Sequence, residues 1–63
     1  MKEIRVTFTG CLIGSIGKTH ACIVYVVAPT GLTADNAKSQ DLELIYAQLY
    51  KSHKHIFNVK INF

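Results

Sequence analysis

The sequence predicts a small α+β domain of order ββαβ, in which a three-stranded sheet carries one helix packed on one face. Residues 2–13 and 55–63 alternate between apolar and polar side chains, with the period of two that is typical of strands. The segment between them contains the only sustained helical period, and its apolar stripe comprises Leu42, Ile45, Tyr46 and Leu49. Residues 1–63 are expected to form one domain, near the lower size limit for a chain that folds alone.

The first strand is expected at residues 2–13, with one apolar and one polar face. Its apolar face holds Ile4, Val6, Phe8 and Leu12, and its polar face holds Arg5, Thr7 and Thr9. Gly10 falls on the apolar side, where a glycine marks a bulge or the close approach of the helix.

A glycine-rich turn follows, and two geometries suit it. Gly14 and Ser15 can form a two-residue type II′ loop. Alternatively, residues 15–17 can form a three-residue loop with Gly17 at positive φ. The choice matters because a shift of one residue in the pairing moves every side chain of a strand to the other face of the sheet.

Residues 12–23 read LIGSIGKTHACI and locally resemble the G-x-x-G loop of KH domains. In that family the loop joins two helices and clamps a nucleic-acid backbone. A glycine hairpin is nevertheless the favoured interpretation, because the following residues Ile23–Val27 favour a strand and His20 stands where an apolar residue is usual. A P-loop would need a glycine in place of Leu12 and a helix after the loop, so nucleotide binding is not expected.

The second strand is expected at residues 18–28 and has no polar face. A strand that is apolar on both sides usually lies centrally in a sheet, so we place it between the other two. One face meets the helix, and the other has no evident cover in so short a chain. Exposed apolar patches of this kind are often covered by a partner or a second copy. The predicted protein interface comprises Ile13, Ala21, Ile23, Tyr25 and Val27.

The helix is expected at about residues 34–53, with Thr33 capping its first turn and Ser39 as a later alternative cap. The third strand is expected at residues 55–63. Because the helix and the strands have similar lengths, the helix can return the chain along the sheet and set the third strand parallel to the second. The expected apolar face of the third strand comprises His55, Phe57, Val59, Ile61 and Phe63.

The net charge is +3, and no acidic residue follows Glu43. A basic end of this kind can attract phosphates or an acidic protein surface. Tyrosines beside lysines can also stack on bases while the lysines meet phosphates. The candidate nucleic-acid patch comprises Arg5, Lys18, Tyr50, Lys51, Lys54 and Lys60.

Zinc-type ligands are present as Cys11, His20, Cys22, His53 and His55, but the chain has no C-x-x-C pair. A buried cysteine ordinarily behaves as a small apolar residue. No pair of spaced carboxylates indicates acid–base chemistry. We therefore expect no metal, no cofactor and no catalytic residues. The longest apolar run, Ala21–Pro29, is too short to span a bilayer, so the predicted location is the cytoplasm.

The sequence thus predicts a small non-enzymatic protein-binding module of a regulatory or inhibitory accessory type. It would associate with itself as a homodimer, or dock on a larger protein, through the open face of its sheet or an edge strand. The alternative is a small basic nucleic-acid-binding protein. Salt distinguishes the two functions, because phosphate-driven binding weakens steeply with added salt and an apolar interface does not.

Overall fold

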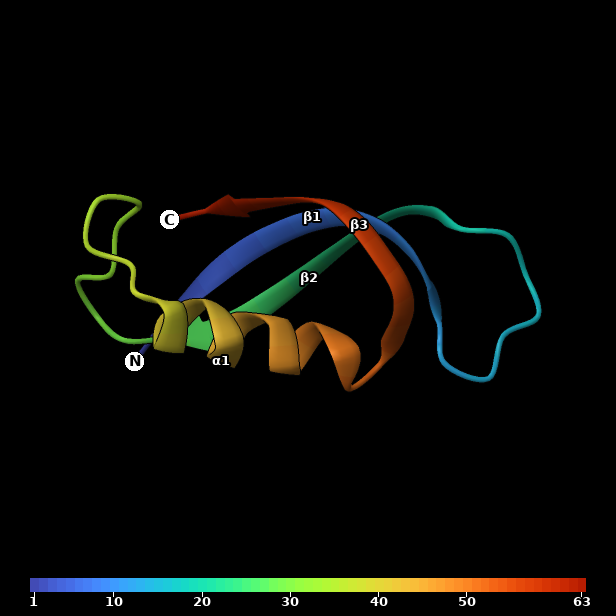
Figure 1. The fold of residues 1–63 in the computed structure, drawn as a ribbon, viewed down its shortest axis with the longest axis horizontal. Coiled ribbons are helices and arrows are strands. Elements are labelled where there is room, and N and C mark those ends of the chain that lie inside the picture. Colours follow the sequence, from blue (N-terminus) through green and yellow to red (C-terminus); the bar gives the residue numbers. More distant parts are fainter.

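The computed structural model describes residues 1–63 and confirms the predicted order and class of the elements (Figure 1). Strand β1 (Lys2–Leu12) and strand β2 (His20–Ala28) precede helix α1 (Ser39–Tyr50), and strand β3 (His53–Asn62) follows it. The three strands form one antiparallel open sheet, and α1 packs on one of its faces. The molecule is elongated, measuring 37 × 18 × 17 Å, with the β1–β2 loop at one end and the β2–α1 connection at the other.

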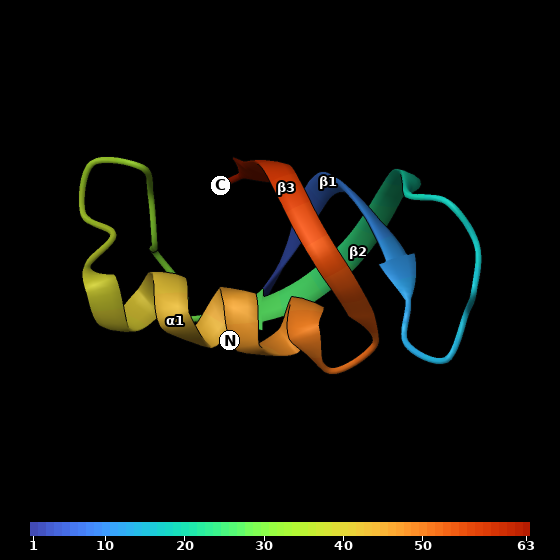
Figure 2. The same cartoon turned by 45° about the vertical axis from the view of Figure 1, so that its right-hand side comes forward.

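The strand order is β2-β1-β3, so the prediction that the second strand is central was wrong. Strand β1 is central because it pairs antiparallel with both neighbours, and its inward residues Ile4, Val6 and Phe8 are buried. Strands β2 and β3 therefore run in the same direction, as predicted, but β1 separates them. Helix α1 carries the chain past β1 from one edge of the sheet to the other (Figure 2).

The pairing of β1 with β2 runs from Lys2 opposite Ala28 to Gly10 opposite His20. The connecting loop spans residues 13–19 and is longer than either predicted turn; Gly14, not Gly17, has the positive φ, at 89°. The loop joins two strands, in agreement with the predicted hairpin and unlike the helix–helix loop of KH domains. This register places the inward side chains of β1 and β2 on the same face of the sheet, so both reach the core.

Two irregularities bend β3 and change which side chains face the core. The pairing of β1 with β3 shifts between Thr7 and Thr9 and again before Cys11, so that β3 has an extra residue at each place. The residues with positive φ in these regions are His55, at 55°, and Asn58, at 54°. The expected apolar face of β3 was therefore wrong in part. Residues Ile56, Val59 and Ile61 pack against the core, whereas His55 and Phe57 are exposed.

Helix α1 begins at Ser39, later than the predicted residue 34. Thr33 makes a cap, but in a separate turn: its hydroxyl accepts a hydrogen bond from the Asn36 N–H at 3.4 Å, and its own N–H donates to Asn36 Oδ1 at 2.7 Å. The carboxylate of Asp41 in the first turn of α1 accepts a hydrogen bond from the Lys38 N–H at 3.0 Å. The polar turn therefore precedes the helix instead of extending it.

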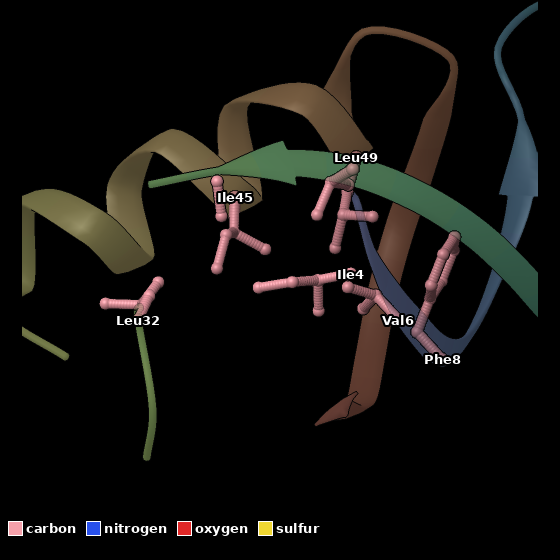
Figure 3. Packing of buried hydrophobic residues seen from close by; sticks show 8 residues of the cluster. Ile4, Val6, Phe8, Leu32, Ile45 and Leu49 are labelled. Carbon is pink, nitrogen blue, oxygen red and sulfur yellow. The ribbon is translucent and has the colours of Figure 1, made fainter. Parts of the chain in front are cut away.

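The hydrophobic core lies between α1 and the sheet. Figure 3 shows Ile45 and Leu49 of the helix directed toward Ile4 and Val6 of β1. Three of the four residues of the predicted helical stripe contact this core, as Ile45 and Leu49 are fully buried and Tyr46 packs partly buried beside them. The buried cluster comprises Ile4, Val6, Phe8, Val26, Ala28, Leu32, Ile45 and Leu49.

Candidate protein-binding edge and open sheet face

The face of the sheet opposite α1 has no cover within the chain. Cross-strand pairing sets its rows: Tyr25 lies beside Arg5, and Ile23 beside Thr7. On the other side of β1, the same rows continue into β3, with Lys60 beside Thr7. We call this surface the open face; it is formed by Glu3, Arg5, Thr7, Thr9, Ala21, Ile23, Tyr25, Val27, Phe57, Lys60 and Asn62.

The apolar side chains of the open face are concentrated along one margin. All four outward residues of β2 are apolar or aromatic, and we call Ala21, Ile23, Tyr25 and Val27 the apolar band. Ile23, Tyr25 and Val27 are 62%, 61% and 49% exposed, which is high for strand residues of this size. The central strand contributes only charged residues and threonines to this face. The band therefore follows the free edge of the sheet and does not cover its centre.

The free edge of β2 is closed at one end by a side chain of the helix. The Gln48 amide accepts a hydrogen bond from the Val27 N–H at 2.9 Å and donates one to the Val27 carbonyl at 2.8 Å. One side chain thus makes both bonds that a neighbouring strand would make at this residue. Because successive residues of an antiparallel strand point their backbone groups to opposite sides, those of Ala21, Ile23 and Tyr25 also point away from β1.

The structure brings together four of the five residues of the predicted interface. Ile13 is the exception: it lies in the β1–β2 loop, where its N–H donates to the Ser52 carbonyl at 2.9 Å. Phe57 lies on the open face opposite Thr9 and is 48% exposed. Sequence reasoning missed Phe57, because simple alternation assigns it to the core side and only the bulges of β3 turn it outward.

The residues of the candidate nucleic-acid patch lie on different parts of the molecule. Arg5 and Lys60 share the open face, whereas Lys18 lies in the β1–β2 loop. Tyr50 is the last residue of α1, and Lys51 follows it, on the side of the sheet that the helix covers. Lys54 pairs with Cys11 at the far end of β3. The open face nevertheless holds two cations and two aromatic rings, from Arg5, Lys60, Tyr25 and Phe57.

The two cysteines are free thiols and lie apart in the pairing. Cys22 lies opposite Phe8, and its sulfur is 3.4 Å from His20 Nδ1. Cys11 is buried in β1, and its sulfhydryl donates to the Lys54 carbonyl at 3.8 Å. His53 packs edge-on against the ring of Phe8, with the ring centroids 5.1 Å apart. Nowhere do three or more potential metal ligands converge.

The molecule has no detectable pocket, and α1 lacks the length and apolar character needed to cross a membrane. Comparison with known protein families, with curated proteins and with solved structures found no match to this chain.

Proposed function

We propose that this protein is a small, non-enzymatic protein-binding module that takes a strand of a partner along the free edge of β2. The observation that carries the proposal is the segment from Ala21 to Tyr25. Its outward backbone groups have no strand partner, and exposed apolar side chains stand beside them. Strand addition supplies main-chain hydrogen bonds at such an edge, and alternate side chains provide specificity. A regulatory or inhibitory accessory protein would bind its partner in this way.

The charge distribution favours docking at the edge over docking across the whole open face. A partner laid flat on this face would cover Arg5 and Lys60, which are exposed. Removing unpaired charges from water is costly. A strand added beside β2 pairs with its backbone, packs its own side chains against one side of the apolar band, and leaves both cations in solvent.

The free edge is also unlike the edges of most soluble sheets. Such edges are usually protected by charged side chains, prolines or bulges. Strand β2 has none of these between Ala21 and Val27, whereas β3, at the other edge, has two irregularities and two lysines. Strand β2 is therefore the edge that is left available for pairing.

The proposal is tested by Ile23→Pro. The N–H of Ile23 points away from β1, so proline removes no hydrogen bond of the sheet but blocks a partner strand. We expect this variant to unfold cooperatively, as the wild type does. It should no longer capture the proteins that the wild type captures from a lysate of its native host. Lys60→Gln, on the open face but on β3, is the control and should retain them. Equal capture by wild type and Ile23→Pro would contradict the proposal.

A second candidate function is nucleic-acid binding by the open face. It is favoured by the exposed rings of Tyr25 and Phe57 beside Arg5 and Lys60, since such rings can stack on single-stranded bases while cations meet phosphates. Here Lys60→Gln should weaken binding of a single-stranded oligonucleotide, and Ile23→Pro should not. Added salt should weaken it further. The two substitutions therefore separate the two functions.

A further inference from the structure

The free segment of the β2 edge is short and has a defined centre. Gln48 occupies the outward groups of Val27, and the β1–β2 loop begins before His20. The outward groups that are left belong to Ala21, Ile23 and Tyr25; the Ala21 carbonyl lies 3.3 Å from Nδ1 of the exposed His20 ring, which has to turn away when a strand pairs here. Ile23 lies at the middle of this set, with one residue of the same orientation on each side.

We infer that the partner strand is β2 of a second copy, paired antiparallel about a two-fold axis at Ile23; this inference rests on the proposed function. In this register Ile23 lies opposite the partner's Ile23, and Ala21 lies opposite the partner's Tyr25. All the outward groups of the free segment are then paired, by about six main-chain hydrogen bonds. The two three-stranded sheets become one continuous sheet, and Val27 keeps its bonds to Gln48.

Side chains on both faces of the sheet fit a like partner. On the open face, the pairing sets two apolar bands side by side, and the Tyr25 ring covers the partner's Ala21. On the helix side, Cys22 and Val24 are half-buried at the margin of the core. In this register Cys22 lies opposite the partner's Val24, and each completes the cover of the other. A partner strand with charged residues in place of Ala21 and Val24 would lack both the contact with Tyr25 and the contact with Cys22.

The charge of the strand permits this approach. Each chain has a net charge of +3, so two copies repel at long range. From Thr19 to Val27, however, the chain has no lysine, arginine, aspartate or glutamate. Repulsion between the two β2 strands is therefore absent where they would touch, and the isologous contact closes as a dimer without further growth.

The first test is the size of the wild-type protein by sedimentation at increasing concentration. We expect the mass to rise from 7.0 kDa toward twice that value. Over the same range, hydrogen exchange at the amides of Ile23 and Tyr25 should slow, because they become bonded. Neither measurement needs a variant to fold. A chain that remains monomeric near millimolar concentration overturns the inference.

The register is tested by single cysteines in a background with Cys11→Ala and Cys22→Ala. Two Ile23→Cys chains would place their Cα atoms about 5.5 Å apart, within the range of a disulfide. Two Tyr25→Cys chains would be separated by about 13 Å along the strand. Mild oxidation should therefore give covalent dimers of Ile23→Cys but not of Tyr25→Cys. The reverse pattern, or no cross-link in a dimeric background, overturns the inferred axis.

The outcomes also distinguish this inference from the proposed function. If the chain is monomeric but captures another protein in a manner that Ile23→Pro abolishes, the second copy is wrong and the strand-binding edge stands. If a dimer forms and Ile23→Pro leaves it intact, the contact between copies lies elsewhere and this inference fails; the proposed function fails as well only if Ile23→Pro captures partner proteins as the wild type does. If the dimer is lost in Ile23→Pro and kept in Lys60→Gln, both are supported.

Discussion

At the scale of single residues, Gly10 shows why one position of the central strand has no side chain. A Cβ atom there would lie 3.1 Å from the Lys54 carbonyl oxygen and 3.3 Å from the ring of Phe8. The backbone of β3 thus passes directly over Gly10. The close approach expected at this glycine is present, but it comes from β3 and not from the helix.

We therefore expect Gly10→Ala to lower the free energy of unfolding by roughly 1–3 kcal/mol, because overpacking against backbone is not easily relieved. Urea unfolding followed by circular dichroism measures this change. Gly17→Ala is the control: its Cβ would meet only the Ser15 hydroxyl, in an exposed loop. That variant should stay within about 0.5 kcal/mol of wild type or gain slightly in stability. Similar losses at both glycines would refute the role of the β3 contact.

Gln48 is the second informative residue, since it supplies a donor and an acceptor to Val27. Gln48→Glu keeps the shape and the acceptor but sets a carboxylate against the Val27 carbonyl. We expect a loss of about 1 kcal/mol in unfolding free energy at neutral pH, measured by urea denaturation. Ala47→Glu, at an exposed position in the same last turn of α1, is the control: it adds the same charge at the same end of the helix dipole and should cost less than about 0.5 kcal/mol. Equal effects would show that helix charge, not the edge contact, is responsible.

At the scale of elements, periodicity predicts β1, α1 and the order ββαβ, because each of these depends on local alternation of side chains. The alternation fails at the end of β1, where Leu12, predicted on the apolar face, is exposed and Cys11 is buried instead. Periodicity does not predict the strand order. A strand that is apolar on both faces, such as β2, is expected to be central, yet β2 lies at an edge with one face uncovered. Alternation also fails in β3, because one inserted residue between Lys60 and Phe57 reverses its phase and a second, between Phe57 and Lys54, restores it; Phe57 lies between the two and turns outward.

The irregularities of β3 can be tested at Asn58, whose φ is 54°. Asparagine tolerates this conformation, whereas a β-branched residue does not. Asn58→Thr should lower the unfolding free energy by roughly 1–2 kcal/mol, and Asn58→Gly should leave it unchanged or raise it. Thermal melts of the variants, with Lys60→Thr as the control in the regular part of β3, measure the difference. Equal destabilisation by Asn58→Thr and Lys60→Thr would mean that the backbone conformation is not the cause.

At the scale of the whole molecule, the chain has one helix for a sheet with two faces. The composition predicts this shortage, and the exposed apolar band confirms that β2 is covered on one face only. What could not be predicted is that Gln48 would close part of the edge. Gln48 lies off the apolar stripe, so the sequence alone suggests a solvated side chain. The extent of the free edge thus depends on the tertiary placement of α1.

The net charge gives a final prediction whose sign separates the two candidate functions. Two chains of charge +3 repel each other, and added salt screens this repulsion over about 8–10 Å. Dimerisation through the uncharged β2 edge should therefore be unchanged or strengthened when sodium chloride is raised from roughly 20 to 500 mM. Binding of an oligonucleotide by Arg5 and Lys60 should weaken over the same range. Binding releases counterions from the phosphates, and this release is less favourable when the salt concentration is high. Sedimentation in both buffers measures the first effect, and oligonucleotide titration measures the second. A dimer that dissociates in salt would be held by charges, which the apolar band does not supply.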